Sequence, residues 1–491
     1  MHKPRALNET ESKTKVEFSA KVVRRQLNEN EQQRSLNLVN RTSLLKIPVN
    51  VQAIIDKLTK SGYEAYVVGG CVRDSVLDRQ PDDWDVTTSA KPSEIKKVFA
   101  RTVDTGIAHG TVTVLSGGEG IEVTTYRIDG QYEDHRHPDK VEFTTSLEQD
   151  LQRRDFTINA MAYNDKVGLV DPFEGIADLK YRNIRCVGEP DKRFDEDALR
   201  ILRAVRFAAQ LDFVIDTKTQ AAIKELAPTL ANISAERIQV EVVKLITSPR
   251  PAIWWQAWEL GITKVIMPEF DAMVTTEQNT PYHMYNVGEH TIKVMENISA
   301  NRVLRLAALL HDVGKPQVRA VDEQGVDHFK RHSEVGEGIA RAILGRLKFD
   351  NDTTTKVLRL IRWHDYRPQA EEKAVRRAIY QIGDDIFTDF LELQYADTMG
   401  KSEADRSEKL QLNSDLRKIY QKIKDEEQCV SLKDLAISGN ELIAMGIPAG
   451  PEIGKILKKA LAEVLDDPSK NTKEYLIAQS TRWHQEAEHV R

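Results

Sequence analysis

YVVGGCVRD, from Tyr66 to Asp74, begins the stretch that decides the fold, and DDWDVTT, from Asp82 to Thr88, follows it closely. The first segment has the pattern of a buried strand, a glycine turn and the start of a helix. Gly69 and Gly70 allow the backbone to approach a ligand, the helix start presents free N–H groups, and Arg73 adds a fixed charge. Taken alone, the segment is better explained as an ordinary tight turn.

Asp83 and Asp85 stand two positions apart in the second segment. On a strand, this spacing points both carboxylates to the same face. Two carboxylates side by side repel each other unless a cation lies between them, and Mg²⁺ takes carboxylate and phosphate oxygens as ligands. Glu122, in the later strand pattern GIEVTTYR, is a third candidate. The pattern predicts a Mg²⁺ site for phosphoryl transfer, and a solvated acidic turn is the alternative.

GG-x-x-RD followed by D-x-D is far more specific than either piece, and the combination resembles the head of the polymerase β-like nucleotidyltransferase superfamily. RTVDTGIAHGTVTVL, IEVTTYR and RRDFTINAMAY resemble its class II tRNA nucleotidyltransferase branch, over about residues 50–270. The resemblance implies an α+β fold, in which an α/β head precedes an all-α neck, body and tail. It also implies that Asp83, Asp85 and Glu122 are catalytic. The implied nucleotide contacts in the head are Gly70, Arg73, Arg154 and Asn159, with Asp155 shaping the same pocket.

The segment FDEDALRILRAVRF predicts one helix with Asp195 as its N-cap. Asp197, Arg200, Arg203 and Arg206 recur every three residues along it and form a polar strip opposite an apolar face. By the resemblance, Glu196, Asp197 and Arg200 form a protein template for the base, and Arg203 and Arg206 contact the nucleotide.

The chemistry of the bases agrees with such a template. Cytosine and adenine each present an amino donor beside a ring-nitrogen acceptor, whereas uracil and guanine present a carbonyl beside an N–H. An Asp acceptor next to the donor fork of an Arg therefore fits C and A and leaves unpaired acceptors against U and G. One pocket can thus serve both CTP and ATP.

The segment RIDGQYEDHRHPDKVEF, residues 127–143, resembles the flexible loop that relatives use when they switch from C to A addition. Arg136 is its expected working residue. A charged loop with Gly and Pro is by default a solvated connection, which remains the alternative.

Six of the chain's 12 histidines lie between His283 and His364. His311-Asp312 closes the apolar helix pattern VLRLAALLHDVGKP, which resembles the HD metal-dependent phosphohydrolase superfamily. Imidazole and carboxylate ligands suit a divalent transition metal, and a metal-activated water would attack a phosphoester. The resemblance gives one ligand set: His290, His311, Asp312, His332, His364 and Asp397. A degenerate module, or one that only binds RNA, is the alternative.

The 491 residues are enough for several domains, and changes in pattern divide the chain into five parts. Residues 1–48 are basic, with little apolar periodicity, and predict a flexible tail. The head is expected over 49–190, the helical neck over 191–275, the HD domain over 276–400, and a helical, tRNA-binding tail over 401–491. Three scattered cysteines predict free thiols rather than a disulfide framework.

Three functions are consistent with these patterns. The first is template-independent addition of CCA to tRNA from CTP and ATP, with a possible HD phosphohydrolase side activity. The second is an A-adding-only enzyme or a bacterial poly(A) polymerase. The third is an HD phosphohydrolase whose head only binds nucleotide or RNA.

No apolar run approaches the length of a membrane span and the first residues are unlike a signal peptide, so the expected location is the cytoplasm. The sequence does not indicate an oligomeric state.

Overall fold

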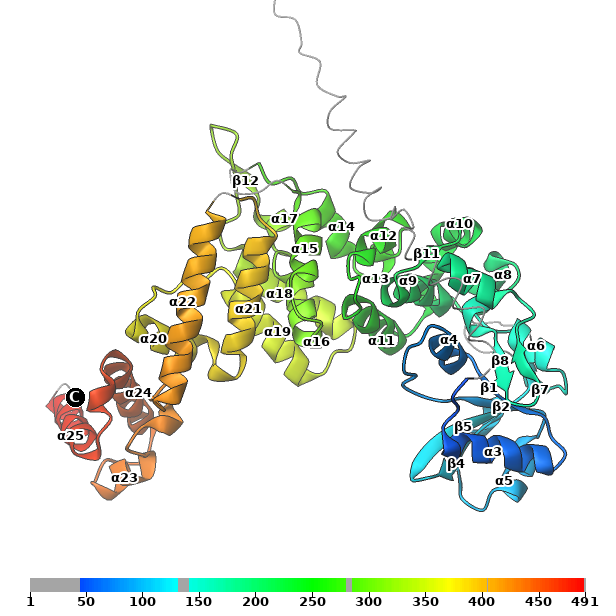
Figure 1. The fold of residues 1–491 in the computed structure, drawn as a ribbon. Coiled ribbons are helices and arrows are strands. Elements are labelled where there is room, and N and C mark those ends of the chain that lie inside the picture. The colour runs from blue at the N-terminus through cyan, green and yellow to red at the C-terminus, as the bar shows by residue number, and fades with distance from the viewer. Residues whose placement is uncertain (1–44, 131–140, 280–284, 404, 490–491) are drawn as a thin grey trace, which may run out of the picture. The chain divides into compact units, whose positions relative to one another are not determined.

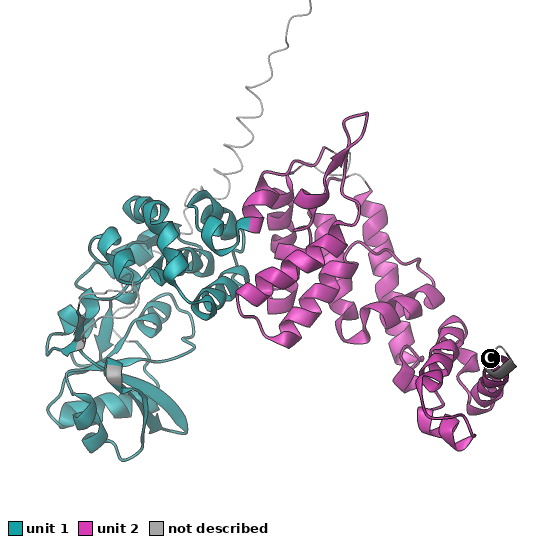
Figure 2. Ribbon diagram, turned by 180° about the vertical axis from the view of Figure 1, so that it is seen from behind, with its two compact units in different colours: residues 1–268 teal, residues 269–491 magenta. Residues whose placement is uncertain are grey.

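The computed structural model describes residues 45–130, 141–279, 285–403 and 405–489. The chain forms two compact units, residues 1–268 and 269–491, which Figure 2 shows in teal and magenta. Most of the predicted basic tail, residues 1–44, lies outside the described residues, and so does Arg136 in the predicted loop. None of the described helices is long and apolar enough to cross a membrane.

A mixed seven-stranded sheet forms the centre of the head, with strand order β3-β4-β5-β2-β1-β8-β9 (Figure 1). Strand β2 pairs parallel with β5, and the other neighbours pair antiparallel. The β4–β5 hairpin turns at Gly117 and Gly118, both with positive φ, as a tight two-residue turn requires. The strands are β1 (Ala65–Val68), β2 (Val86–Thr88), β3 (Thr102–Gly106), β4 (Thr111–Ser116), β5 (Glu119–Thr125), β8 (Ala162–Asn164) and β9 (Gly168–Val170).

The prediction that Asp83 and Asp85 lie within a strand is wrong. Strand β2 begins at Val86, and both carboxylates lie in the segment before it. Pro81 has no N–H to donate and Asp is a poor strand former, so this segment does not extend the ladder. The carbonyl of Asp85 still accepts the Val68 N–H at 3.0 Å, which places Asp85 beside the end of β1.

The prediction of a single helix beginning at Asp195 is also wrong. Asp195 lies inside α8 (Pro190–Glu196), and α9 (Leu199–Leu211) is a separate helix. Between them, Asp197 is extended, at φ −145° and ψ 102°. Its carboxylate accepts the Leu199 N–H at 3.1 Å, so Asp197 caps the start of α9 and interrupts the run.

The neck continues as helices that follow the head in the same unit. They are α10 (Thr217–Leu226), α11 (Ala235–Ile246), α12 (Ile253–Glu259) and α13 (Thr263–Ile266). Helices α9 and α11 pack against each other, each burying an apolar face.

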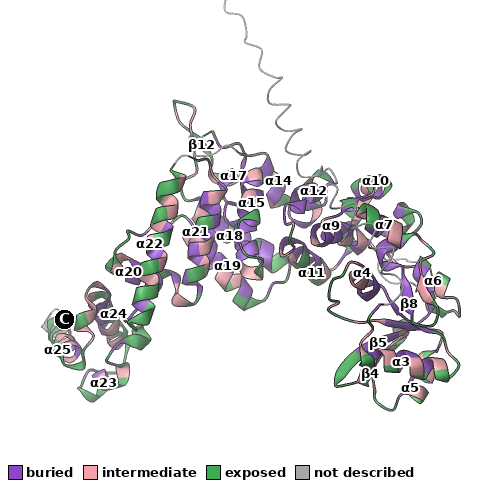
Figure 3. Cartoon of the chain, in the orientation of Figure 1, coloured by how far each residue is buried: buried purple, intermediate pink, exposed green. Residues whose placement is uncertain are grey.

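The second unit is almost entirely helical, and its interior is the buried region around α15, α16 and α21 in Figure 3. The helices that carry its chemistry are α15 (Val287–Glu296), α16 (Arg302–Leu310), α18 (His332–Arg346), α19 (Asn351–Trp363) and α21 (Phe387–Met399). A smaller hydrophobic cluster lies in the tail around α23 (Gly439–Ala444), α24 (Pro451–Asp466) and α25 (Lys473–His489). All three cysteines are buried free thiols, as expected.

Candidate active site and metal centre

The first unit contains a cavity of about 550 Å³ where the head strands, α4 (Gly70–Val76) and α9 converge. A cavity of this size can enclose most of a nucleotide. Basic side chains outnumber acidic ones in its lining. The structure brings eleven predicted residues together in this wall: Gly70, Arg73, Asp83, Asp85, Arg154, Asp155, Asn159, Asp197, Arg200, Arg203 and Arg206.

The acidic side of this cavity is formed by Asp83 and Asp85, together with Asp82. Burial, then the neighbouring charge of Asp83, raises the pKa of Asp85 to about 6, and Glu122 adds to the rise. Glu122 is exposed on β5 and is not part of the cavity lining, but its charge reaches Asp85. Crowded carboxylates of this kind favour binding of a divalent cation.

Gly69 is favoured by its backbone conformation, and the end of the Arg154 side chain lies close to it. A Cβ at Gly69 would lie 2.8 Å from Nη1 of Arg154, and φ is +83° at this residue. A Cβ at Gly70 would meet only Nη2 of Arg73, at an ordinary 3.7 Å. Gly69 therefore leaves room for the Arg154 guanidinium beside the turn, a contact that the sequence alone does not reveal.

Arg73 and Asn159 are fixed by each other. The Arg73 guanidinium donates to both oxygens of Asp74, at 3.0 and 2.7 Å, and its Nη1 donates to Oδ1 of Asn159 at 2.7 Å. Phe207 lies beside three guanidinium groups, at 3.9 Å from Arg206, 5.1 Å from Arg73 and 5.3 Å from Arg203. This ring holds the cations close together by cation–π attraction.

Arg203 and Arg206 are each held by a buried acid. Nε of Arg203 donates to Oδ2 of Asp155 at 2.7 Å. Burial by itself would raise the pKa of Asp155, but the charges of Arg203 and Arg200 bring this pKa far below its usual range. Nε of Arg206 lies 2.7 Å from Oε2 of Glu241 on α11, and burial lowers the pKa of Arg206 to about 10. Both arginines remain cations at neutral pH.

The predicted base-reading residues lie on two sides of the break between α8 and α9. Asp197 pairs with Nη2 of Arg237 at 2.7 Å, and Arg200 pairs with Glu196 at 2.5 Å. Glu196 does not line the cavity, whereas Asp197 and Arg200 do. The Asp197 carboxylate, which accepts hydrogen bonds, and the Arg200 guanidinium, which donates them, therefore line the same cavity, and an ion pair holds each of them.

Several residues of the cavity were missed at the sequence level. Arg237 and Lys244 reach it from α11, and Glu241 lies between them on the same helix face. A charge every three to four residues in the otherwise apolar pattern ERIQVEVVKLI was the available signal. The other missed members of the lining are Asp74, Asp82, Arg153, Leu199, Phe207 and Gln210.

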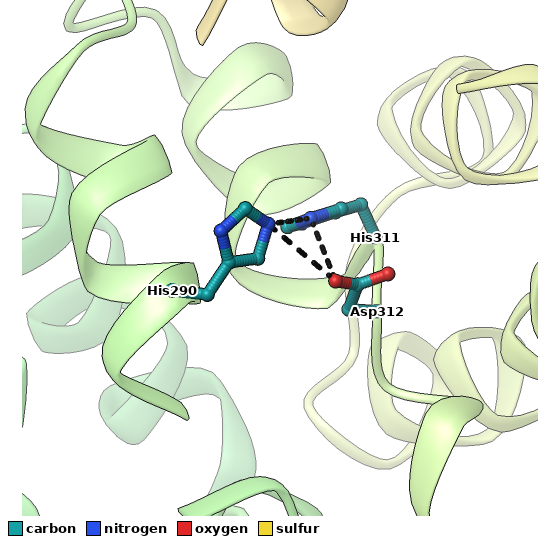
Figure 4. A group of neighbouring side chains, drawn as sticks. All are labelled: His290, His311 and Asp312. Carbon is teal, nitrogen blue, oxygen red and sulfur yellow. Dashed lines mark hydrogen bonds and ion pairs between the residues drawn. The ribbon is translucent and has the colours of Figure 1, made fainter. Parts of the chain in front are cut away.

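The second unit gathers all six predicted metal ligands in its core, although they come from distant segments. His290 lies on α15, His311 and Asp312 follow α16, His332 begins α18, His364 follows α19, and Asp397 lies on α21. All six are buried. Figure 4 shows His290, His311 and Asp312 directed toward one another.

The orientation of the imidazoles favours metal binding. Nδ1 of His311, His332 and His364 lies 2.8, 2.8 and 2.7 Å from the carbonyl oxygens of Ala308, Phe329 and Ile361, respectively. An Nδ1–H that donates to a carbonyl leaves Nε2 with its lone pair, which is the atom that binds metals. In all three residues Nε2 points toward the other ligands.

A pocket of about 360 Å³ lies beside part of this centre. Asp312, His332, His364 and Asp365 line it together with four cations, Lys315, Lys330, Arg331 and Lys401. Nζ of Lys315 lies 2.8 Å from Oδ2 of Asp312, and Nζ of Lys401 lies 2.6 Å from Oδ2 of Asp397. The surplus of cations suits an anionic ligand.

Three family models match the chain. Residues 65–185 match the poly A polymerase head domain, residues 212–274 match a model described as a probable RNA and SrmB-binding site of polymerase A, and residues 332–479 match tRNA nucleotidyltransferase domain 2. The head match contains Asp83, Asp85 and Arg154, and the second match contains Arg237 and Lys244.

Curated relatives cover most of the chain. It is 38% identical over 434 residues to a CCA-adding enzyme of Limosilactobacillus reuteri, covering 86% of this chain and 94% of the relative. It is 34% identical over 439 residues to a CCA-adding enzyme of Levilactobacillus brevis, covering 87% and 96%. Among solved structures, the Bacillus stearothermophilus CCA-adding enzyme in complex with CTP aligns with a TM-score of 0.65 at 29% identity, covering 90% of this chain and 98% of that one. The fold also matches the Thermotoga maritima CCA-adding enzyme complexed with tRNA, with a TM-score of 0.54 at 21% identity over 90% and 97%.

Proposed function

This chain belongs to the family of CCA-adding enzymes, and we propose that its reaction takes place in the cavity of the first unit. The enzyme transfers CMP and AMP from CTP and ATP to the 3′ end of tRNA and releases pyrophosphate. The observation that supports this site is the meeting of Asp83 and Asp85 with a cluster of buried arginines in one nucleotide-sized space.

The acidic side of the cavity is proposed to hold the divalent metal on which this reaction depends, with Mg²⁺ as the ion. Asp83 and Asp85 supply carboxylate oxygens for it, and Glu122 adds negative charge nearby. The ion supplies activation of the tRNA 3′ hydroxyl and charge neutralisation on the pyrophosphate. The 3′ oxygen bonds to the α-phosphorus as the bond to the leaving pyrophosphate breaks.

The basic side binds the rest of the nucleotide. Arg154, Arg203 and Arg206 are proposed to bind the triphosphate, because each is a held cation in the cavity wall. Asp197 and Arg200 are proposed to read the base edge, accepting from the amino group and donating to the ring nitrogen of C or A. Their partners Arg237 and Glu196 hold them in place, so the pocket is ordered before the base arrives.

The domain limits predicted from the sequence remain part of this proposal. The neck over 191–275 carries the base-reading residues, and the tail over 401–491 is proposed to contact tRNA phosphates through Lys455, Lys458 and Lys459. The tRNA, CTP and ATP consumed by the reaction favour a cytoplasmic location, which we propose as well.

Product length tests this function directly. A tRNA ending at the discriminator base is incubated with Mg²⁺ and each nucleotide, singly and together, and the products are separated on a sequencing gel. We expect two C residues and one A, followed by arrest. Addition of A only to a CC end, or an A tail of unlimited length, would contradict the proposal. Asp83→Ala removes a proposed metal ligand and should abolish incorporation.

A metal-dependent phosphohydrolase is proposed as a second activity. Its support is the convergence of His290, His311, Asp312, His332, His364 and Asp397 in one buried centre. These residues fit a divalent transition metal, which would supply activated water for attack on a phosphoester. His311→Ala should abolish phosphoesterase activity on RNA 3′ ends and leave CCA addition intact. If phosphoesterase activity survives in His311→Ala, this second activity is refuted.

A further inference from the structure

We propose that Asp150 is a positioning residue for the nucleotide cavity, which fixes Arg154 against the strand that follows Asp83 and Asp85. This inference rests on the proposed function of the first unit, since it assigns a role to a residue that acts on that site from outside it. Asp150 lies on α6 (Leu147–Gln152), and its side chain is fully buried although it does not line the cavity.

A fully buried carboxylate must be paired and hydrogen-bonded, because its charge is otherwise too costly to remove from water. Asp150 meets this requirement through contacts with four residues, Thr87, Arg127, Arg153 and Arg154. Burial by itself would raise the pKa of Asp150, but the charges of Arg153 and Arg154 hold this pKa below its usual value. The carboxylate is therefore ionised at neutral pH, and each of its oxygens accepts from a different set of partners.

The Oδ2 oxygen of Asp150 joins Arg154 to strand β2. It accepts the Thr87 hydroxyl at 3.0 Å and lies 3.6 Å from Nη2 of Arg154. Thr87 stands on β2 two residues after Asp85, so one oxygen contacts both the strand that follows the proposed metal ligands and the guanidinium. The position of Arg154 relative to Asp85 is therefore set through Asp150.

Arg154 needs this anchor because its charge acts on a proposed metal ligand. Burial and Asp83 raise the pKa of Asp85, whereas the charge of Arg154 lowers it. A guanidinium that was free to move toward Asp85 would compete there with a cation. Nε of Arg154 has no hydrogen-bond partner in the described part of the chain, so no hydrogen bond at that atom holds the guanidinium in place.

The Oδ1 oxygen of Asp150 supports a different part of the site. It accepts Nε and Nη2 of Arg153, at 3.0 and 2.8 Å, and the backbone N–H of Arg127 at 3.3 Å. The carbonyl of Arg153 in turn accepts Nη2 of Arg200 at 3.0 Å. Oδ1 therefore supports the base-reading arginine through the backbone, while Oδ2 supports the arginine proposed to bind the triphosphate.

Asp150→Asn separates the effects of the two oxygens. Oδ1 faces three N–H donors, so the amide oxygen should take its place and the amide NH₂ group should take the place of Oδ2. The NH₂ group can donate to the Thr87 hydroxyl, but it meets Arg154 as one donor meets another. The substitution therefore keeps the support of Arg200 and removes the anchor of Arg154.

Steady-state incorporation of CMP into a tRNA that ends at the discriminator base tests this role. In Asp150→Asn we expect the KM for CTP to rise about tenfold, the size of one lost interaction with a charged group, while selection of CTP over UTP is unchanged. Asp104→Asn is the matched control, because it removes a carboxylate of the same head from an exposed pair with Lys96. Its KM should equal that of the native chain. An unchanged KM in Asp150→Asn would overturn the proposal.

Arg154→Gln shows whether Asp150 acts through this arginine. If it does, Asp150→Asn should raise the KM no further in a chain that already carries Arg154→Gln, whereas two independent effects would multiply. The same increase in both backgrounds would assign Asp150 a purely structural role and overturn the proposal. A native KM in Arg154→Gln alone would instead refute the proposed triphosphate contact, which separates failure of the proposed site from failure of this inference.

Circular dichroism at the assay temperature reports whether each variant is folded. If Asp150→Asn melts below that temperature, calorimetric titration with CTP in the cold gives the same comparison as a Kd. The Kd should rise about tenfold in Asp150→Asn and rise no further when Arg154→Gln is already present. A Kd equal to that of the native chain would overturn the proposal.

Discussion

Burial and neighbouring acids raise the pKa of Asp85. Its pKa is raised to about 6 by burial first and by Asp83 next, so the folded protein holds this proton up to a higher pH than the unfolded chain does. A raised carboxyl pKa means that folding stability falls as pH rises from about 4 through about 6. A metal ion reverses the effect, because it favours the ionised carboxylate.

Melting temperatures in the presence of a chelator check this behaviour. Between pH 5 and pH 7.5, the native chain should lose stability relative to Asp85→Asn, which does not titrate. Added Mg²⁺ with CTP should remove most of the difference. A pH-independent difference between the two proteins would show that Asp85 does not titrate in this range.

Asp197 is the residue at which selection of the base can be measured. Asp197→Ala should relax discrimination against UTP by roughly 1–3 kcal/mol, the size of a good base contact, measured as the ratio of kcat/KM for CTP and UTP. Arg237→Gln is the matched control, since it breaks the same ion pair but keeps the acceptor. Equal relaxation in both variants would assign the effect to the ion pair rather than to base reading.

At the level of elements, the turn between β1 and α4 depends on a backbone conformation. Gly69→Ala places a Cβ at positive φ and 2.8 Å from Arg154, so we expect a loss of about 1–2 kcal/mol in the free energy of unfolding and a fall in kcat. Gly70→Ala is the control for stability, because its Cβ has room. Denaturant unfolding measures both, and equal stability of the two variants would contradict the explanation.

The break between α8 and α9 shows how one side chain can override a periodic pattern. FDEDALRILRAVRF has the spacing of a single helix, but Asp197 bonds to the Leu199 N–H and to Arg237 from a distant helix. The polar strip of the pattern is therefore confirmed for Arg200, Arg203 and Arg206 on α9, while Asp197 lies at its capped start.

For the whole molecule, the division into two compact units predicts two separable stabilisation effects. CTP with Mg²⁺ should protect the first unit, and a transition metal should protect the second. At a ligand concentration about 100 times the Kd, the free energy of unfolding of each unit should rise by about 2.7 kcal/mol. Hydrogen exchange followed by peptide resolves the units. Protection of both units by either ligand alone would contradict independent sites.

The sequence by itself determined the class of chemistry. Carboxylates two positions apart, a double-glycine turn and arginines in register are local patterns. The α+β fold and the CCA-adding family, which the resemblance of these patterns to known nucleotidyltransferases implied, are confirmed. The six predicted metal ligands of the second unit were named from a resemblance to the HD superfamily, and the structure brings their side chains together.

Only the tertiary structure decided which charges face one another. Arg237 and Lys244 reach the nucleotide cavity because α11 packs on α9, and Asp312 lies in two groups of candidate ligands because histidines from α15, α16, α18 and α19 meet beside it. Such contacts depend on how distant segments pack, whereas a sequence pattern reports only which residues share one face of one element. The packing of distant segments, rather than composition, therefore sets the burial that raises the pKa of Asp85, the pairing of Asp197 with Arg237 and the shape of both sites.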